Sequence, residues 1–254
     1  MYPVIVRIGS FEITSFGALV ALGFLCGLWV FRRELRARGL PERIENAAII
    51  GAAGGLLGAK LIWVVEFSGD QPVTDLLFSR AGLSWFGGFM GGVGSGIVAI
   101  RVMGAPLVRT LAAAAPALAV GHMLGRIGCF LVGDDYGRPS MLPWAVAFPN
   151  GLPPTDIPVH PTQLYEAVFL GGLAYWLIRA RRRGASDGAV LGQYFLLAGG
   201  FRFLLEFIRI NEQILFGLTL AQMFAAGLAL VGVWLLIRAR AGKARIGRAS
   251  HPPA

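Results

Sequence analysis

The sequence predicts an all-α, polytopic membrane protein with about seven transmembrane helices. Of its 254 residues, 56% are hydrophobic and only 15% are charged, whereas soluble domains usually carry about 25% charged residues. Long apolar runs separate the charged stretches, and the positive charges gather in alternate loops. These observations indicate that a lipid bilayer is the solvent for most of the chain.

Seven apolar segments are each long enough to cross a hydrocarbon layer about 30 Å thick, which requires roughly 20 residues in a helix. In the third of them, small residues recur at spacing four in WFGGFMGGVGSG, which predicts close packing against another helix. The expected spans are Ile13–Phe31, Ile44–Phe67, Gly82–Val102, Leu107–Gly125, Pro161–Ile178, Ala189–Ile208 and Gly217–Ile237.

The loops between these segments alternate in their content of Lys and Arg. Loops on one side hold 16 of these residues and loops on the other hold six, while Lys60 lies within a span. Because cytoplasmic loops are the ones enriched in Lys and Arg, we expect the N-terminus outside and the C-terminus in the cytoplasm. The net charge of +9 then reflects topology and attraction to anionic lipid, and we do not expect nucleic acid as a partner.

We expect residues 1–240 to form a single transmembrane helical domain and residues 241–254 a basic cytoplasmic tail. The first apolar run is followed by RRELRARG and not by a small-residue cleavage site, so we interpret it as an anchor. Cys26 and Cys129 form neither a disulfide framework nor a CxxC pair, and the three His residues are not grouped. We therefore expect no metal and no cofactor.

The stretch GHMLGRIGCFLVGDDYG carries more polar groups than its apolar surroundings explain. In a helix, His122, Arg126 and Cys129 occupy one face at i, i+4 and i+7. Gly125 and Gly128 allow backbone or a ligand to approach closely, and GDDYG is typical of a turn. Snorkelling to lipid headgroups would explain a lone Arg, but the combination favours a binding site.

The stretch VHPTQLYEAVF is typical of a helix start, because Pro is tolerated in the first helical turn. His160 precedes that turn, and Gln163, Tyr165 and Glu166 fall within it. Two interpretations stay open. Glu near a helix N-terminus is ordinary capping chemistry and Tyr is an ordinary interfacial residue, or the group belongs to the same site.

The stretch FRFLLEFIRINE places Arg202, Glu206 and Arg209 on one helical face. An ion pair explains the first two and leaves one positive charge over. With Arg126 and Lys60, these side chains predict a cationic pocket at the outer membrane interface. Such a pocket suits a lipid phosphate, because guanidinium groups offer paired donors to phosphate oxygens.

Together these stretches resemble the prolipoprotein diacylglyceryl transferase family over nearly the whole chain. The family's H-P-[ST]-Q-L-Y-E is matched by residues 160–166, its F-R-F-x-x-E-x-x-R by residues 201–209, and LTLAQM is similar to its L-[TS]-x-[GA]-Q. Its G-R-x-G-N-F-x-N-G-E-x-[FY]-G has Asp134 in place of Glu. The positions matching this pattern are Gly125, Arg126, Gly128, Phe130, Gly133, Tyr136 and Gly137.

The chain also departs from the family pattern. Phe86 stands where S-[FY]-H-G-G has His, and Cys129 and Val132 stand at the two Asn positions of the signature. Phe16 replaces a usual Tyr in the first helix, and Lys60 replaces a usual Arg. The resemblance is therefore to a divergent member.

The resemblance implies that the chain transfers a diacylglyceryl group from phosphatidylglycerol to the lipobox cysteine of preprolipoproteins. It also implies a multi-pass protein of the bacterial inner membrane with its active site on the periplasmic side. The expected partners are phosphatidylglycerol, preprolipoprotein signal peptides and membrane lipid. Because of the departures, one alternative stays open: an altered homologue that binds phospholipid or modifies a different acceptor.

In this reaction the resemblance assigns phosphate binding and leaving-group stabilisation to Arg126 and Arg202, with Glu206 orienting Arg202. The proton acceptor is His122, Glu166 or His160, in that order of preference. For Cys129, a packing role is favoured over a role as nucleophile. The expected substrate-binding residues are Gly125, Gly128, Asp134, Tyr136, Gly137, His160, Gln163, Tyr165, Arg209 and Lys60.

The departures remove a base and not a cation. A thiol with a pKa of about 8.5 is already partly ionised at neutral pH, so a missing base costs ~10- to 100-fold in rate. A missing cationic donor costs ~10²–10³-fold, because charge develops on the leaving phosphate. Arg126, Arg202 and Arg209 of the family pattern are all present, and this favours an active enzyme.

Overall fold

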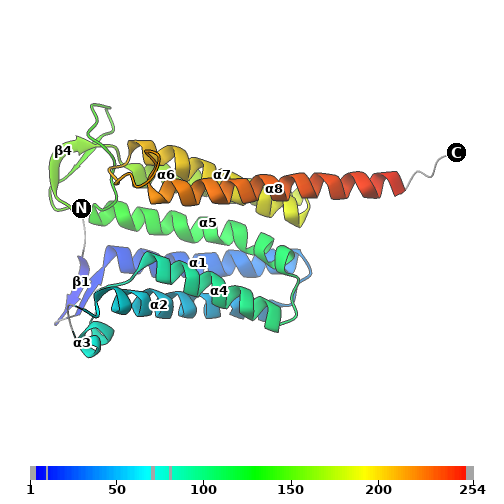
Figure 1. Cartoon of the computed structure of the whole chain (residues 1–254), viewed down its shortest axis with the longest axis horizontal. Coiled ribbons are helices and arrows are strands. Elements are labelled where there is room, and N and C mark those ends of the chain that lie inside the picture. Colours follow the sequence, from blue (N-terminus) through cyan, green and yellow to red (C-terminus); the bar gives the residue numbers. More distant parts are fainter. Residues whose placement is uncertain (1–3, 10, 70–71, 80–81, 250–254) are drawn as a thin grey trace. The chain divides into compact units, whose positions relative to one another are not determined.

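The computed structural model of the chain describes residues 4–9, 11–69, 72–79 and 82–249. It divides into two compact units. Unit 1 comprises Met1–Val30 and Ala112–Ala254, and unit 2 comprises Phe31–Leu111. Two long helices, α1 (Ser15–Ala37) and α5 (Leu107–Val132), contribute residues to both units (Figure 1).

Unit 1 contains three further long helices and a short 3-10 helix, η2, that continues α7. Between α6 and α7, Gly184 adopts a φ of +82°, which a side chain would strain. Ser186 then caps α7, because its Oγ accepts the N–H of Ala189. The bounds are α6 Thr162–Arg182, α7 Asp187–Leu205, η2 Glu206–Ile208 and α8 Leu220–Ala249.

Glycines let the helices of unit 1 approach closely. Helices α7 and α8 lie side by side (Figure 1), and a Cβ on Gly199 would lie 2.6 Å from the carbonyl O of Ala225. Similarly, a Cβ on Gly23 of α1 would lie 2.9 Å from the carbonyl O of Gly121 of α5. Small residues at these contacts are typical of helix pairs in membranes, where packing replaces the hydrophobic effect.

Two short antiparallel hairpins of unit 1 add β structure that the all-α expectation did not include. They pair β1 (Val4–Ile8) with β2 (Phe11–Thr14) and β3 (Val146–Phe148) with β4 (Thr155–Val159). Each strand is too short for a clear two-residue periodicity in the sequence. Burial anchors the second hairpin, because Phe148 is 1% and Val159 is 2% exposed.

Unit 2 is built around the pair α2 and α4, which pack through their glycines. A Cβ on Gly54 would lie 2.8 Å from the carbonyl O of Gly91, and one on Gly55 would lie 3.3 Å from the carbonyl O of Gly88. This confirms the packing predicted from the small residues of the third segment. The bounds are η1 Glu42–Glu45, α2 Asn46–Phe67, α3 Val73–Phe78 and α4 Trp85–Val102.

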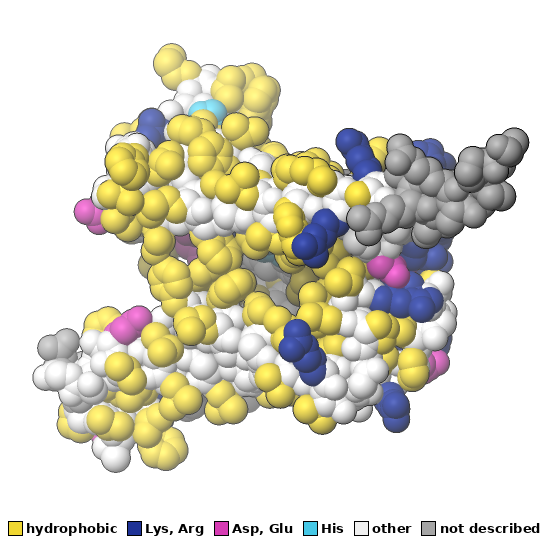
Figure 2. All heavy atoms as spheres, turned by 45° about the vertical axis from the view of Figure 1, so that its right-hand side comes forward, with side chains coloured by type: hydrophobic (Ala, Val, Ile, Leu, Met, Phe, Trp, Pro, Cys, Tyr) yellow, Lys and Arg dark blue, Asp and Glu magenta, His cyan; other side chains and the backbone are white. Residues whose placement is uncertain are grey.

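Large hydrophobic side chains cover much of the exposed helix surface (Figure 2). Leu25, Leu57, Val168 and Leu230 are between 62% and 78% exposed. Soluble proteins avoid apolar surface on this scale, whereas lipid-facing helices require it. The chain is thus a helical, multi-pass membrane protein, as predicted.

Six helices of the described chain are long and apolar enough to cross a membrane. Helix α6 lies at the expected fifth span but is not one of them, because its first turn is polar and its last turns carry Arg179, Arg181 and Arg182. The count of seven and the orientation of the termini therefore stay predictions. Two helices are longer than expected, because α5 continues past Gly125 and α8 continues into the predicted tail.

Candidate functional site

Residues 122–129 are helical, as the predicted polar face requires, because α5 continues through them to Val132. The Nε–H of Arg126 donates to Nε2 of His122 at 3.3 Å, one helical turn away. Nη1 of Arg126 lies 4.0 Å from Sγ of Cys129. Three side chains of one helix thus contact one another through the central guanidinium.

Arg126 also joins a chain of ion pairs that connects separate segments of unit 1. Its Nε lies 2.8 Å from Oε2 of Glu166 on α6, and its Nη1 lies 2.7 Å from Oδ2 of Asp135 in the turn after α5. The other oxygen of Asp135 lies 2.7 Å from Nη2 of Arg209. One carboxylate therefore bridges two guanidinium groups that are 83 positions apart in the sequence.

Glu206 continues this chain at the end of α7. Its carboxylate, 3% exposed, pairs with Arg202 and lies 3.6 Å from Nε of Arg209. Its second oxygen accepts hydrogen bonds from Asn211 Nδ2 at 2.5 Å and from Thr219 Oγ1 at 2.9 Å. A fully paired carboxylate of this kind fixes the direction in which Arg202 points.

Thr219 links the same network to the start of α8. The N–H of Thr219 donates to Oε1 of Gln222, and the N–H of Gln222 donates to Oγ1 of Thr219. This reciprocal arrangement is a capping box. The Gln of LTLAQM thus orients a threonine that in turn holds Glu206.

The network differs in charge from the cationic pocket that the sequence predicted. Three guanidinium groups, of Arg126, Arg202 and Arg209, face three carboxylates, of Glu166, Asp135 and Glu206. Their formal charges cancel. The cationic pocket expected from the sequence does not count the carboxylates of Glu166 and Asp135, which the structure pairs with Arg126 and Arg209.

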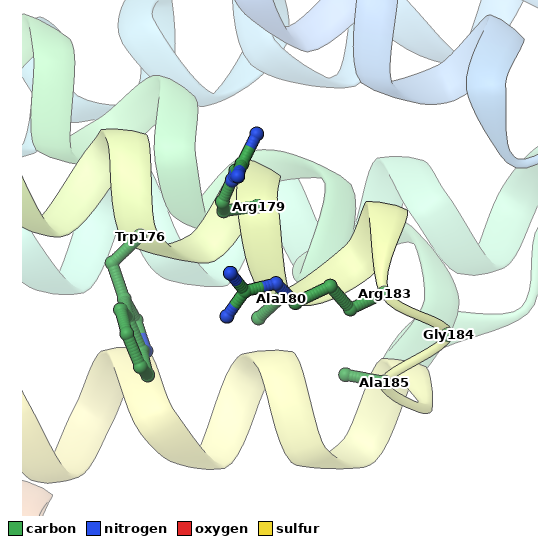
Figure 3. A pocket seen from close by; sticks show the side chains of 6 residues that line it. All are labelled: Trp176, Arg179, Ala180, Arg183, Gly184 and Ala185. Carbon is green, nitrogen blue, oxygen red and sulfur yellow. The ribbon is translucent and has the colours of Figure 1, made fainter.

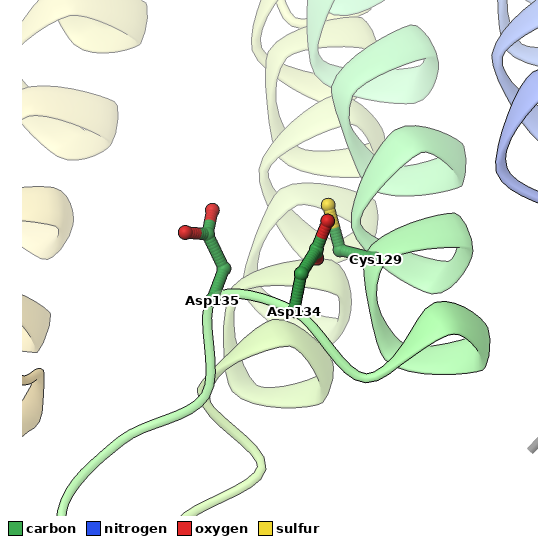
Figure 4. A group of neighbouring side chains, drawn as sticks. All are labelled: Cys129, Asp134 and Asp135. Carbon is green, nitrogen blue, oxygen red and sulfur yellow. The ribbon is translucent and has the colours of Figure 1, made fainter. Parts of the chain in front are cut away.

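The two adjacent aspartates after α5 have different surroundings. Figure 4 shows Asp134 beside the thiol of Cys129, while the carboxylate of Asp135 points to another side. Burial raises the pKa of Asp134, and its Oδ1 has no hydrogen-bond partner within the described chain. Burial alone would also raise the pKa of Asp135, but Arg209 and Arg126 outweigh it and hold that pKa below its usual value.

These aspartates and Cys129 are the one group of candidate metal ligands in the described chain, with ligand atoms within 4.8 Å of one another. The donor set does not suit a cation. Both oxygens of Asp135 are already held at 2.7 Å by guanidinium groups, so a metal ion would meet two like charges. A metal-free site stays our prediction.

The chain is similar to proteins of known family over most of its length. The prolipoprotein diacylglyceryl transferase family matches residues 3–238. Relatives named phosphatidylglycerol–prolipoprotein diacylglyceryl transferase include one from Nitratidesulfovibrio vulgaris (strain Miyazaki F), 35% identical over 253 residues and 94% of each chain. Others come from Geobacter sulfurreducens, 34% identical over 82% of each chain, and Clostridium tetani, 32% identical over 82% of this chain and 86% of the relative.

The chain belongs to the prolipoprotein diacylglyceryl transferase family. Three stretches that carry its family patterns lie far apart in the sequence. The structure joins them through the Arg126–Glu166 pair and through Asp135, which bridges Arg126 and Arg209. Asp135 occupies a position that the family pattern leaves unspecified. The sequence did contain a signal for Asp135, because it directly follows Asp134, which stands at the Glu position of the family pattern. The sequence analysis did not use this signal.

Other residues of the transferase family patterns hold the turn after α5 in place. The hydroxyl of Tyr136 donates to the carbonyl of Pro153 at 2.6 Å, and its ring stacks on Phe148. A Cβ on Gly137 would lie 2.6 Å from the carbonyl O of Ile208. The contacts of Tyr136 and Gly137 thus position Asp135, and direct contact of either residue with substrate stays a prediction.

Residues of the H-P-[ST]-Q-L-Y-E stretch divide into two groups. Gln163, 1% exposed, donates through Nε2 to the carbonyl of Asp134 and so supports the same turn. His160 and Tyr165 instead contact each other, with Nδ1 and the hydroxyl 3.3 Å apart, and Trp144 Nε1 donates to that hydroxyl at 2.7 Å. Within the described chain, His160 and Tyr165 join no ion pair of the network.

The two glycines of the HMLGRIGC stretch have different surroundings. A Cβ on Gly128 would lie 3.3 Å from Phe16 of α1, so this glycine permits helix packing. A Cβ on Gly125 would meet nothing within 4 Å. Of the two, Gly125 faces open space next to Arg126 in the chain, as the close approach of a ligand would require.

Two positions tied to the family's departures belong to unit 2. The ammonium of Lys60 donates to the carbonyl and hydroxyl of Ser79 at 2.9 and 3.0 Å. Phe86, where the transferase family has His, lies in the first turn of α4. Participation of Lys60 in phosphate binding stays a prediction.

Proposed function

We propose that this protein transfers the diacylglyceryl group of phosphatidylglycerol to the lipobox cysteine of a preprolipoprotein. The observation that carries the proposal is the chain of ion pairs in which Asp135 bridges Arg126 and Arg209. It brings together groups suited to hold a phosphate, in the segments that carry the family patterns. The names of the relatives give the same substrates and the same reaction.

In the proposed reaction the thiolate sulfur attacks the glyceryl carbon of the diacylglyceryl group that bears the phosphate oxygen. A C–S bond forms, the C–O bond breaks, and its electron pair leaves on glycerol phosphate. The guanidinium groups of Arg126 and Arg202 bind the phosphate and stabilise the charge that develops on it. Preorganised cations at such a position act strongly because they need no rearrangement during the reaction.

Asp135 holds the phosphate subsite before the lipid arrives. Its carboxylate occupies Arg126, which binds the phosphate, and also contacts Arg209, which adds positive charge to the subsite. Binding of phosphatidylglycerol displaces it, because a phosphodiester and a carboxylate compete for the same donors. Asp135 is exposed and lies in a turn, so it has room to move aside.

His122 accepts the proton of the thiol. Because Arg126 donates to its Nε2, that nitrogen carries the lone pair of a neutral imidazole. The ring is 45% exposed, whereas the alternative acceptor Glu166 is 4% exposed and is engaged by Arg126. Exposure is what a base needs in order to meet an incoming thiol.

The remaining assignments complete the proposal. Gly125 lies beside the lipid headgroup, and Glu206 and Gln163 are positioning residues. The reaction takes place at the periplasmic side of the bacterial inner membrane, where signal peptides of preprolipoproteins arrive. The site requires no cofactor.

The test uses purified protein in proteoliposomes with labelled phosphatidylglycerol and a lipobox peptide. The product, a thioether-linked diacylglyceryl peptide, is identified by mass spectrometry. We expect Arg126→Ala and Arg202→Ala each to lower kcat about 10²–10³-fold. Arg182→Ala, an exposed arginine at the far end of α6, is the matched control and leaves the rate unchanged.

A second function, phospholipid binding without transfer, is favoured by Phe86 and Cys129, which replace a His and an Asn of the family patterns. The same assay separates the two. Saturable lipid binding with no thioether product would show this second function and overturn the first. Restored growth of a strain depleted of its own transferase would support the first.

A further inference from the structure

A pocket of about 290 Å³ opens at the turn between α6 and α7 (Figure 3). This end of the hairpin is remote from the ion-pair network. Asp187 and Arg202 are 15 residues apart on α7, and at 1.5 Å per residue they lie about 22 Å apart along the axis. The pocket is lined by Trp176, Arg179, Ala180, Arg183, Gly184 and Ala185.

Two arginines that line this pocket, Arg179 and Arg183, join no ion pair within the described chain. Arg179 lies in the last turn of α6, Arg183 is the C-cap residue of that helix, and both are exposed. Figure 3 shows the Arg183 guanidinium between α6 and α7, whereas the Arg179 side chain points away from α7. Like charges at this spacing repel each other. Alternation of charge between loops explains why basic residues lie at this end, but it does not explain why these two line one pocket.

The indole of Trp176 is fixed at the other end of the pocket. Its Nε1 donates to Oε1 of Gln193 on α7 at 3.1 Å. Figure 3 shows the Arg183 guanidinium on the side of α6 where the Trp176 ring reaches toward α7. Tyr175, 66% exposed, adds apolar surface on the same helix.

The chemistry of this lining fits a phosphate group attached to an apolar body. A guanidinium group can donate two parallel hydrogen bonds to two oxygens of one phosphate. The N-terminus of α7, next to Ala185, also favours an anion. Trp, the aromatic residue of the lining, favours the headgroup level of a membrane. The volume suits a headgroup and not a larger ligand, because pockets for whole small molecules run from about 300 to 1,000 Å³.

We propose that Trp176, Arg179 and Arg183 form a second phosphate-binding site, which holds the headgroup of an anionic lipid at the end of the α6–α7 hairpin opposite the ion-pair network. Basic pockets between helices bind anionic headgroups elsewhere in membrane proteins. The site is independent of the transfer reaction. It anchors the hairpin that carries Glu166 and Arg202 at its other end.

The test measures binding of phosphatidic acid to the detergent-purified full chain by native mass spectrometry. Phosphatidic acid has no glycerol headgroup, and the Arg126→Ala/Arg202→Ala background removes binding at the ion-pair network. In that background, Arg179→Gln/Arg183→Gln should weaken the apparent Kd about tenfold or more, since charge-assisted contacts to phosphate are lost. Phosphatidylcholine should bind weakly to both proteins.

The matched control is Arg182→Gln/Arg240→Gln. It removes the same charge from two exposed arginines at the same end of unit 1, where α8 meets α7 at Gly188 and Ala239. We expect less than a twofold change in Kd. Equal losses in the two double variants, or no loss in either, would overturn the proposal, because net charge alone would then govern binding.

A steric variant provides an independent readout. Ala185→Leu keeps every charge but places a larger side chain on the lining of the pocket, and it should also weaken lipid binding. Inorganic phosphate identifies the source of the ligand. If millimolar phosphate binds with the same dependence on Arg179 and Arg183, the site serves soluble phosphates, and if only the lipid binds, it serves the membrane. Unchanged lipid binding in Ala185→Leu would place the lipid outside the pocket and sink the proposal.

Discussion

Asp135 determines the electrostatic state of the site at the scale of single residues. Its carboxylate pairs with both Arg126 and Arg209. Without it, the two guanidinium groups would repel each other with no carboxylate bridging them. Its backbone has a φ of +60°, a conformation that favours Asn, Asp or Gly. The turn thus delivers a carboxylate to a point between two segments, at a small conformational cost.

Asp135→Asn should lower the apparent KM for phosphatidylglycerol about tenfold and change kcat less. If the wild-type carboxylate leaves the subsite about one tenth of the time, the apparent dissociation constant is about ten times the intrinsic one. The measurement is steady-state kinetics in proteoliposomes, with Asp156→Asn, an exposed aspartate of β4, as control.

A fall in kcat with unchanged KM would instead make Asp135 a positioning residue for Arg126 and would contradict its competition with phosphate. Binding of glycerol phosphate, followed by thermal shift, gives the same comparison without turnover. It therefore tests Asp135 even in the case that the protein performs no transfer.

Asp134→Asn should stabilise the protein at pH 7.5, and the gain should shrink as pH falls toward 4. Burial raises the folded-state pKa of Asp134 above its unfolded value. The ionised group therefore costs stability above the folded pKa, and this cost disappears as protonation sets in at lower pH. Removal of a partly buried negative charge is worth about 1 kcal/mol, or about 2–4 °C in Tm.

Thermal unfolding in detergent across this pH range measures the effect, again with Asp156→Asn alongside. A gain that is constant with pH would show that the charge of Asp134 is not the cause.

At the scale of elements, the α2–α4 pair depends on the absence of side chains. Gly91 faces the backbone of Gly54 and Gly58, and a Cβ there would lie 3.1 Å from the Cα of Gly58. Gly94, in the same helix, would meet nothing within 4 Å. Two glycines of the same helix thus have opposite tolerance for substitution, because Gly91 contacts the backbone of α2 and Gly94 faces open space.

Gly91→Leu should destabilise the protein by about 1–3 kcal/mol or more, since the backbones must separate to admit the side chain. Gly94→Leu is the matched control and should leave the midpoint of thermal unfolding within about 2 °C. Equal tolerance of both substitutions would refute the close approach of α2 and α4.

At the scale of the whole molecule, the open question is whether α6 crosses the membrane. Its apolar part is shorter than that of the other long helices, because charged and polar turns occupy both ends. It nevertheless carries Glu166 at one end and the Arg179–Arg183 pocket at the other. The topology predicted from charge places these ends on opposite sides.

A membrane-impermeant maleimide should label Met141→Cys in intact cells and Arg182→Cys only after the inner membrane is permeabilised. Met141 is fully exposed in the segment before α6, and Arg182 is exposed at the end of α6. The parent chain, with Cys26 and Cys129, supplies the background signal. Labelling of both positions from outside would show that α6 does not cross and would reduce the span count.

Local sequence patterns were enough to predict the helical membrane architecture and the kinds of residue expected at the site. Hydrophobic runs of bilayer length and the spacing of His122, Arg126 and Cys129 depend only on local periodicity, which is visible in one dimension. The small-residue pattern of α4 was sufficient for the same reason. The two β hairpins were not predictable, because strands of three to five residues leave no such periodicity.

The ion pairs between distant residues could be identified only from the three-dimensional structure. The pairing of Arg126 with Glu166 and the bridge from Arg126 through Asp135 to Arg209 join residues 40 and 83 positions apart. Such contacts depend on how the helices pack and on where the turn after α5 places Asp135. They cannot be predicted from the spacing of residues along the sequence. The same reason explains why the sequence did not predict that the network is neutral or that a pocket lies beside Trp176.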